Sequence, residues 1–394
     1  MPAEPAAPAA PPAVVAVVVT KDPGPWFEAT LAGLRDQDYP NLAVLVLDAG
    51  SAEDPTARIA AVHPRAFVRR LDGDPGFAAA ANEALTAVEG AAFLLLCHDD
   101  VVPDPSCIRL LVEEAYRSNA AVVGPKLVAY DDPEVLLEVG LTIDRFGIPY
   151  SDIEPGELDQ EQHDAVRDVF HVSSAVMLVR ADLFRALDGF DPVTFPGGED
   201  LDLCWRARLL GGRVMVVPDA RARHLEAADE REHAGHAALG VRNRLRVVLK
   251  AYSAPTLTWV APVAFLLGLL EAAVFAVTRR GRRARAVLAA WAWNLGHLPD
   301  LRRSRRAVQA GRTVHDRDLS FLQVRGSARI RAFVTRRLHA DDRLQTITTA
   351  GRDVVEAATT RLRRPLVLGE PPSWPSCSSA RGRSSPVTCR GSAP

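Results

Sequence analysis

The stretch Val14-Val15-Ala16-Val17-Val18-Val19-Thr20 is the first of several short apolar runs that decide the fold. β-branched residues favour strands, and a continuous apolar run of this length is typical of a strand buried on both faces. Similar runs predict strands at residues 42–47, 66–71 and 91–97. Helical patterns separate them, and this alternation predicts a parallel sheet joined by right-handed crossovers.

The intervening helices are expected over residues 26–36, 57–62 and 76–88. Two later runs, at residues 172–180 and 213–217, are expected to be further strands. The predicted fold class is therefore α/β, with a Rossmann-like, mostly parallel central sheet flanked by helices.

Composition narrows the functional classes. The chain has 394 residues, of which 48% are hydrophobic, and a formal net charge of −2. A large buried core is therefore expected, and no global basic field indicates a nucleic-acid partner. The five cysteines show no metal or redox spacing, so we expect a reducing compartment and no disulfide framework.

Carboxylates follow two of the predicted strands, where parallel sheets bind ligands. Asp48 ends one apolar run, and its side chain is expected to accept from a base N–H or a ribose hydroxyl, or else to cap a turn. His98-Asp99-Asp100 ends another run. Oxygen ligands suit Mg²⁺ or Mn²⁺, so Asp100 is the predicted metal ligand, with Asp99 or His98 at the ribose or the metal. The alternative is that these residues cap the next helix.

A second acidic cluster lies at the predicted helix start Gly197-Gly198-Glu199-Asp200-Leu201-Asp202-Leu203-Cys204-Trp205-Arg206. A carboxylate can act as a general base that takes the proton of an attacking hydroxyl, and Glu199-Asp200 is expected to supply it. The alternative is that both acids only complement the helix dipole. His224, expected in a loop after the strand at residues 213–217, is a possible nitrogen ligand for the same metal or simply a solvated side chain.

Over roughly residues 13–226 the chain resembles a family 2 glycosyltransferase of the GT-A fold. The resemblance rests on six motifs in order: Val17-Val18-Val19-Thr20, Val46-Leu47-Asp48-Ala49-Gly50-Ser51, Gly76-Phe77-Ala78-Ala79-Ala80-Ala81-Asn82, His98-Asp99-Asp100, Gly189-Phe190-Asp191, and Gly198-Glu199-Asp200 with the residues up to Arg206. It implies inverting transfer from a nucleotide-activated sugar, usually with Mg²⁺ or Mn²⁺.

The resemblance also assigns roles to individual residues. It implies that Thr20 and Asp48 hold the nucleoside with Asn82 nearby, and Asp99 is expected beside them at the nucleotide sugar. It makes Asp100 the metal-binding end of an Asp-x-Asp motif. It makes Asp200 the base, with Glu199 beside it, and His224 a contact of the metal or the diphosphate.

Two departures from the family pattern refine this expectation. His98 stands where the first Asp of Asp-x-Asp is usual, as in the rhamnosyltransferase-like members. The Gln-x-x-Arg-Trp motif of processive synthases is absent, so addition of one sugar or a few is expected.

Beyond this region, residues 256–278 are mostly apolar and long enough to cross a bilayer, although a buried helix of a soluble protein is the alternative. Arginine runs nearby suit anionic lipid heads. The expected divisions are a disordered leader at 1–12, a GT-A domain at 13–250, an apolar helical membrane-associated segment at 251–301 with its membrane contact at 255–301, a basic helical extension at 302–363, and a disordered tail at 364–394.

The leading expectation is a glycosyltransferase at the cytoplasmic face of the cell membrane, acting on a lipid-linked or cell-envelope glycan acceptor. One alternative is a nucleotidyltransferase that makes nucleotide sugars, although residues 20–25 are a poor version of its glycine-rich basic loop. The other is a non-catalytic member that binds a nucleotide sugar and serves as a scaffold in a membrane complex.

Overall fold

The computed structural model describes residues 10–324, apart from the side chains of residues 227–237. Most of the predicted leader, most of the predicted basic extension (residues 325–363) and the whole predicted tail at 364–394 lie outside the described residues.

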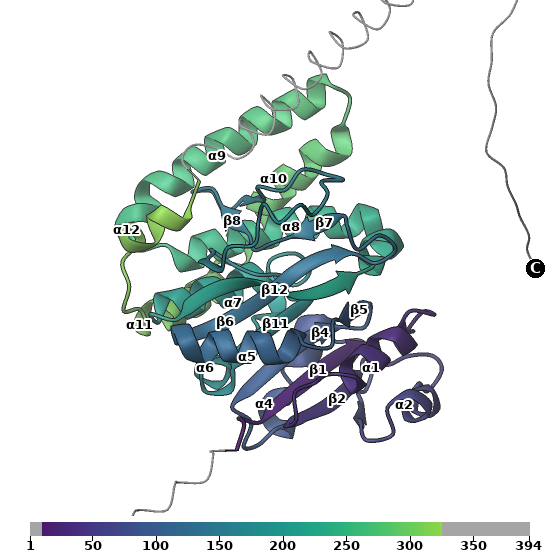
Figure 1. Ribbon diagram of the computed structural model, residues 1–394. Helices are drawn as coiled ribbons and strands as arrows, with labels where there is room; N and C mark the ends of the chain where they lie inside the picture. Colours follow the sequence, from purple (N-terminus) through teal and green to yellow (C-terminus); the bar gives the residue numbers. More distant parts are fainter. Residues whose placement is uncertain (1–9, 325–394) are drawn as a thin grey trace, which may run out of the picture. The chain divides into compact units, whose positions relative to one another are not determined.

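Residues 14–98 build the parallel half of the sheet (Figure 1). β1 (Val14–Thr20) lies between β2 (Leu42–Asp48) and β4 (Phe93–His98), and β3 (Phe67–Arg70) pairs with β2. All three pairings are parallel, as predicted. The register sets Thr20 opposite Asp48, and Val19 opposite His98. The carboxyl ends of these strands therefore bring the predicted site residues to one edge.

The second half of the sheet is mixed. β11 (Val176–Arg180) runs antiparallel between β4 and β6 (Ala120–Ala129), whereas β6 and β12 (Arg213–His224) are parallel. The expectation of a mostly parallel sheet thus holds only for the first half. No helix lies between β6 and β11, and the chain enters β11 at the carboxyl end of β4, so β11 runs antiparallel to both neighbours. Short strands complete the sheets: β5 (Val101–Pro103), β7 (Leu136–Glu138), β8 (Thr142–Ile143), β9 (Pro149–Tyr150) and β10 (Arg167–Asp168).

Helices flank the sheet, and the predicted α/β class is confirmed. They are α1 (Phe27–Arg35), α2 (Thr56–Val62), α3 (Phe77–Ala81), α4 (Ala84–Ala87), α5 (Cys107–Ser118), α6 (Ala181–Ala186), η1 (Pro192–Thr194) and α7 (Glu199–Leu209). The single helix predicted at residues 76–88 is wrong, because it divides into α3 and α4 at Asn82. The Asn82 amide group holds a distant loop: it donates to the carbonyl of Phe190 at 2.9 Å and accepts from the Phe190 N–H at 2.8 Å.

The structure also corrects the expected position of His224. It is the last residue of β12 and not part of a loop. The strand was expected to end at residue 217, just before Pro218. Instead the strand continues through Pro218, and its pairing with β6 is interrupted by a register shift between Val217 and Arg221. Beyond the shift, β12 pairs with β5 as well as β6, and this pairing keeps it extended to His224.

The last helices are α8 (Ala227–Ala251), α9 (Ala254–Val277), α10 (Gly281–Gly296), α11 (Leu298–Ala310), α12 (Asp316–Leu319) and the turn η2 (Ser320–Leu322). α9 and α10 form a hairpin that Figure 1 shows on the far side of the domain from β1 and β2. Among the described helices, α9 alone has the length and composition to cross a membrane, and 17% of its most apolar window is buried.

The segment after this hairpin returns to the sheet domain. Arg305 and Gln309 of α11 donate to the backbone carbonyls that end α8, including those of Lys250 and Tyr252. Further along, the N–H of Thr313 donates to Leu209 at the end of α7, and the N–H of Val324 to Ile143 in β8. Leu319 is buried in the same cluster as Trp205 and Leu209. The α9–α10 hairpin is therefore anchored to the domain at both of its ends.

Candidate active site

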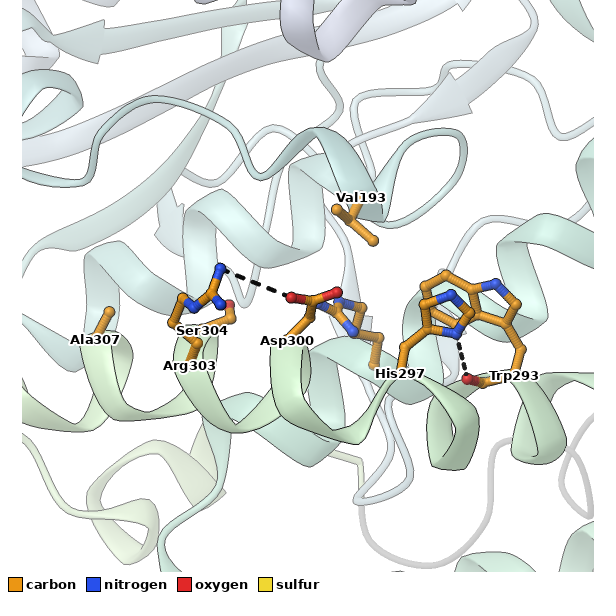
Figure 2. A pocket seen from close by; sticks show the side chains of 8 residues that line it. Val193, Trp293, His297, Asp300, Arg303, Ser304 and Ala307 are labelled. Atoms are coloured by element: carbon orange, nitrogen blue, oxygen red, sulfur yellow. Dashed lines mark hydrogen bonds and ion pairs between the residues drawn. The ribbon is translucent and has the colours of Figure 1, made fainter.

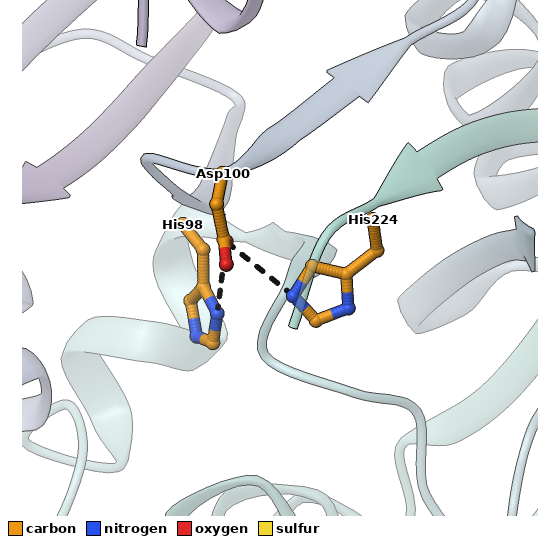
Figure 3. A group of neighbouring side chains, drawn as sticks. All are labelled: His98, Asp100 and His224. Carbon is orange, nitrogen blue, oxygen red and sulfur yellow. Dashed lines mark ion pairs between the residues drawn. The ribbon is translucent and has the colours of Figure 1, made fainter. Parts of the chain in front are cut away.

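Three predicted side chains meet at the carboxyl edge of the sheet (Figure 3). His98 ends β4, Asp100 lies in the following turn, and His224 ends β12. Their ligand atoms lie within 4.8 Å of one another. Nε2 of His224 is 3.4 Å from Oδ1 of Asp100, and Nδ1 of His98 is 3.9 Å from the same oxygen. The structure thus brings together Asp100 and His224, and of the two further candidates at the ribose or the metal it places His98 in this cluster.

The chemistry of this cluster suits a divalent metal ion. Burial, with help from neighbouring His224 and against the pull of Asp100, lowers the pKa of His98 to about 4. The imidazole is therefore neutral at physiological pH, and a nitrogen lone pair is available to a metal. Two imidazole nitrogens and one carboxylate oxygen leave further coordination positions open, as catalytic sites require.

The acidic pair lies at the start of α7, where the sequence predicts it. Gly198 is the residue before the helix, and its N–H donates to Oε2 of Glu199 at 2.9 Å. The N–H of Leu201 donates to Oδ1 of Asp200 at 2.6 Å. Burial first, and then the charge of Asp200, raise the pKa of Glu199 to about 7. Glu199 is buried and Asp200 is half-buried, so Asp200 is the more accessible carboxylate.

Ser174 joins the two clusters. Its Oγ lies 3.5 Å from Nε2 of His98 and 3.5 Å from Oε1 of Glu199. The loop before β11 carries this serine to the carboxyl end of β4. No sequence motif marks Ser174, because its position depends on the antiparallel entry of β11. The metal-type cluster and the acidic pair are consequently parts of one site.

Glu138 is a second residue that the sequence did not reveal. It is half-buried at the end of β7 and accepts the N–H of Ser173 at 3.0 Å. Burial, followed by the charge of Asp200, raises the pKa of Glu138 to about 8. It lies in a region of short strands and turns without a recognisable motif. A protonated carboxyl group at neutral pH therefore stands close to the acidic pair.

The predicted nucleoside contacts lie next to this cluster. Thr20 Oγ1 donates to Oδ2 of Asp99 at 2.6 Å, so these two residues hold each other. Asp48 is fully buried; it accepts the N–H of Ser51 at 3.0 Å and lies 3.2 Å from Nε of Arg70. Asp48 thus fixes the loop after β2, and its contact with a nucleoside stays a prediction.

The amide group of Asn82 is half-buried and is bonded at both ends to the backbone of Phe190. A Cβ added to Gly189 would approach Oδ1 of Asn82 to 2.2 Å, so the glycine allows this close packing. The structure gives Asn82 a role in joining two loops. Its predicted place near the nucleoside is untested.

Comparison with known proteins adds a family match. The model of the family described as "Glycosyltransferase like family 2" matches residues 11–248. The O-antigen biosynthesis protein RfbC of Myxococcus xanthus is 28% identical over 204 residues, which are 50% of this chain and 16% of that protein. The pre-mycofactocin glycosyltransferase of Mycobacterium tuberculosis (strain ATCC 25618 / H37Rv) is 29% identical over 186 residues, 46% of this chain and 37% of that protein. The chain thus spans well under half the length of these curated relatives.

Two solved structures illustrate the more distant likeness. The crystal structure of GalNAc-T7 with UDP, GalNAc and Mn²⁺ has a TM-score of 0.49 at 14% identity and covers 61% of this chain and 48% of that one. The mannosyltransferase PcManGT from Pyrobaculum calidifontis, in complex with GDP-Man and Mn²⁺, has a TM-score of 0.45 at 18% identity, covering 77% and 86%.

Proposed function

This chain belongs to the glycosyltransferase-like family 2, and we propose from its site that it moves a sugar, with inversion, from a nucleotide-diphosphate sugar to a cell-envelope or lipid-linked glycan acceptor. The observation that carries the proposal is the position of Ser174, whose hydroxyl oxygen lies 3.5 Å from both His98 and Glu199. Inverting transfer needs a base on the acceptor side and a charge-stabilising group on the diphosphate side of one reacting carbon. Ser174 lies between the acidic pair, which would supply the base, and the His98 cluster, which would stabilise the diphosphate charge.

Asp200 is the proposed base. Its carboxylate takes the proton of the acceptor hydroxyl while the hydroxyl oxygen forms a bond to the anomeric carbon. The bond between that carbon and the diphosphate oxygen breaks, and the nucleoside diphosphate leaves with the electron pair. At neutral pH Glu199, with a pKa near 7, is partly protonated, and Glu138, with a pKa near 8, is mostly protonated. Asp200 is the more accessible carboxylate of the acidic pair, which favours it as the base.

His98, Asp100 and His224 are the residues that would hold a divalent ion beside the diphosphate. Such an ion offsets the negative charge that develops on the departing diphosphate. Imidazole nitrogen is a ligand typical of transition metals, and this donor set favours Mn²⁺ over Mg²⁺.

We also propose that the chain works at the cytoplasmic face of the cell membrane. The support is α9, whose side chains remain exposed at Leu266 (63%), Leu270 (62%) and Val277 (83%). Leu288 and Leu295 of α10 are exposed as well. An apolar face of this length suits a lipid surface and is rare on a soluble monomer.

The test is calorimetric titration of the full chain with UDP, GDP and dTDP, each with Mn²⁺ and with a chelator. We expect one nucleotide to bind in a metal-dependent way, and Asp100→Asn to abolish that dependence. Asp104→Asn, which removes a carboxylate outside the cluster, is the matched control and should bind like the wild type. If the wild type and Asp100→Asn both bind the nucleotide equally well with Mn²⁺ and with the chelator, the metal assignment is wrong. Nucleotide binding without sugar transfer, measured in a separate turnover assay, would favour the scaffold alternative.

A further inference from the structure

A cavity of about 440 Å³ lies between α8, α10, α11 and the turn η1 (Figure 2). It is separate from the residues assigned to sugar transfer. The side chains that line it are Val193, Arg246, Trp293, His297, Asp300, Arg303, Ser304 and Ala307. Its volume is within the range of small-ligand sites, and its lining combines aromatic, cationic and hydroxyl groups.

Arg246 is the decisive residue. Its side chain belongs to α8, lines the cavity and is only 3% exposed. Nε and Nη1 of its guanidinium are buried and have no hydrogen-bond partner among the described residues. The ring of Trp293, 5.6 Å from the guanidinium carbon, gives only a cation–π contact. A buried charge with unsatisfied donors is costly unless an anion satisfies it.

The other buried cations of the described chain differ from Arg246 in this respect. Lys126, Arg206 and Lys250 each form ion pairs with aspartates. Arg208 donates to three backbone carbonyls. Arg246 therefore differs from the other buried cations, because it lines the cavity while its buried Nε and Nη1 groups have no hydrogen-bond partner among the described residues.

We propose that this cavity binds a phosphoryl group, with Arg246 as its principal ligand. A guanidinium donates two parallel hydrogen bonds that match phosphate oxygens. Arg303 adds a second cation at the cavity, and Ser304 adds a hydroxyl donor. Asp300 brings an opposing carboxylate, which lies 3.8 Å from Nη1 of Arg303 and partly balances it. The ring of Trp293, stacked on His297 at 4.1 Å, supplies an apolar wall for the group that carries the phosphate.

Two sources can deliver this chemistry: the headgroup of an anionic lipid, or a soluble phosphate compound. The cavity adjoins α10, which packs against the apolar helix α9, so a lipid phosphate has a direct approach. The proposal concerns binding alone and does not depend on sugar transfer.

The experiment measures binding to the full chain in detergent by calorimetry and to vesicles by co-sedimentation. The probes are inorganic phosphate, vesicles of phosphatidylcholine with phosphatidic acid, and vesicles of phosphatidylcholine alone. We expect saturable binding of phosphate or of the phosphatidic acid vesicles, weakened at least about tenfold in Arg246→Gln because charge-assisted hydrogen bonds are lost. Arg306→Gln, on the exposed side of α11, removes the same charge and should bind like the wild type.

The outcomes separate the sources and test the site. Binding of inorganic phosphate without the vesicles identifies a soluble ligand, and binding of phosphatidic acid vesicles alone identifies a lipid; both support the proposal if Arg246→Gln weakens them. Equal binding by the wild type and Arg246→Gln, or no saturable binding of any probe, overturns it. If Arg246→Gln does not fold, Ser304→Trp fills the same cavity from a half-buried position and must weaken binding in its place.

Discussion

Lys250→Met is expected to destabilise the domain more than any surface charge change. Lys250 lies in the last turn of α8 and is 1% exposed. Its Nζ lies 2.5 Å from Oδ2 of Asp191 and 2.6 Å from Oδ1 of Asp202. Asp202 belongs to the same helix as the proposed base, and Asp191 begins the turn that leads to it. Methionine keeps the bulk of the side chain and removes only the charge.

The expected loss in the free energy of unfolding depends on the contacts that Asp191 and Asp202 keep in the variant. Asp202 keeps an ion pair with Arg206, at 2.7 Å, and Asp191 keeps the N–H of Val193, at 3.1 Å. Removing one partner of a buried ion pair costs about 3–5 kcal/mol, and these remaining contacts place the expected loss at about 3 kcal/mol. For a domain of this size that loss lowers the melting temperature by roughly 6–12 °C.

The assay is thermal unfolding of the full chain in detergent, with Lys21→Met as the matched control. Lys21 pairs with Asp74 at 2.7 Å, but both side chains are nearly half exposed. An exposed pair contributes roughly 0–1 kcal/mol, so this control should melt close to the wild type. A Lys250→Met protein that melts within about 2 °C of the control would refute the reasoning.

The same variant has a predictable pH dependence. Burial works to raise the pKa of Asp191, but Lys250 and the hydrogen bonds to its carboxylate together hold that pKa below its usual 3.8. A depressed folded-state pKa stabilises the protein above the unfolded pKa, and this contribution is lost as the pH falls through the folded value. The gap in stability between the wild type and Lys250→Met should therefore be complete above pH 4 and shrink below it.

Three further predictions address the site. Asp200→Asn should lower turnover by about 10²–10⁴-fold and leave donor affinity nearly unchanged, since the base acts on the acceptor; loss of donor binding in calorimetry would contradict this role. His224→Gln should weaken Mn²⁺-dependent nucleotide binding at least about tenfold, and an unchanged affinity would exclude it as a ligand. Glu138→Gln should gain stability relative to the wild type as the pH rises from 5 to 9. In the folded wild type the pKa of Glu138 is raised from 4.5 to about 8, so the wild type loses stability as the pH rises through 8, whereas glutamine does not titrate. A stability difference that does not change with pH, measured by thermal unfolding, would show that Glu138 is ionised throughout.

Local sequence patterns were sufficient to predict the strands and the helix that carry functional residues at their ends. The apolar runs before Asp48 and His98 specify β2 and β4, and the Gly-Gly turn before Glu199 marks the start of α7. In each case the chemistry lies at the point where the hydrophobic pattern stops, and that point is visible in a single sequence. The predicted resemblance to family 2 glycosyltransferases is confirmed by the family match.

Structural features that depend on contacts between residues far apart in the chain could not be predicted from the sequence. The break in the helix at Asn82 is fixed by its bonds to Phe190, more than one hundred residues later. Ser174 reaches the site only because β11 enters the sheet antiparallel to β4. The extension of β12 to His224 depends on pairing with β5 across a shift that follows Val217. None of these partners is encoded in a local periodicity.

The anchoring of the α9–α10 hairpin at both ends has a mechanical consequence. A membrane anchor joined by a flexible linker leaves its catalytic domain free to sample heights and orientations above the bilayer. Here α8 leads directly into α9, and Arg305 and Gln309 of α11 bind the backbone where α8 ends. A lipid surface that accepted α9 would thus hold the sheet edge with His98 and Asp200 at one fixed height and tilt, so the reach of the enzyme would be set by the length of the acceptor it meets.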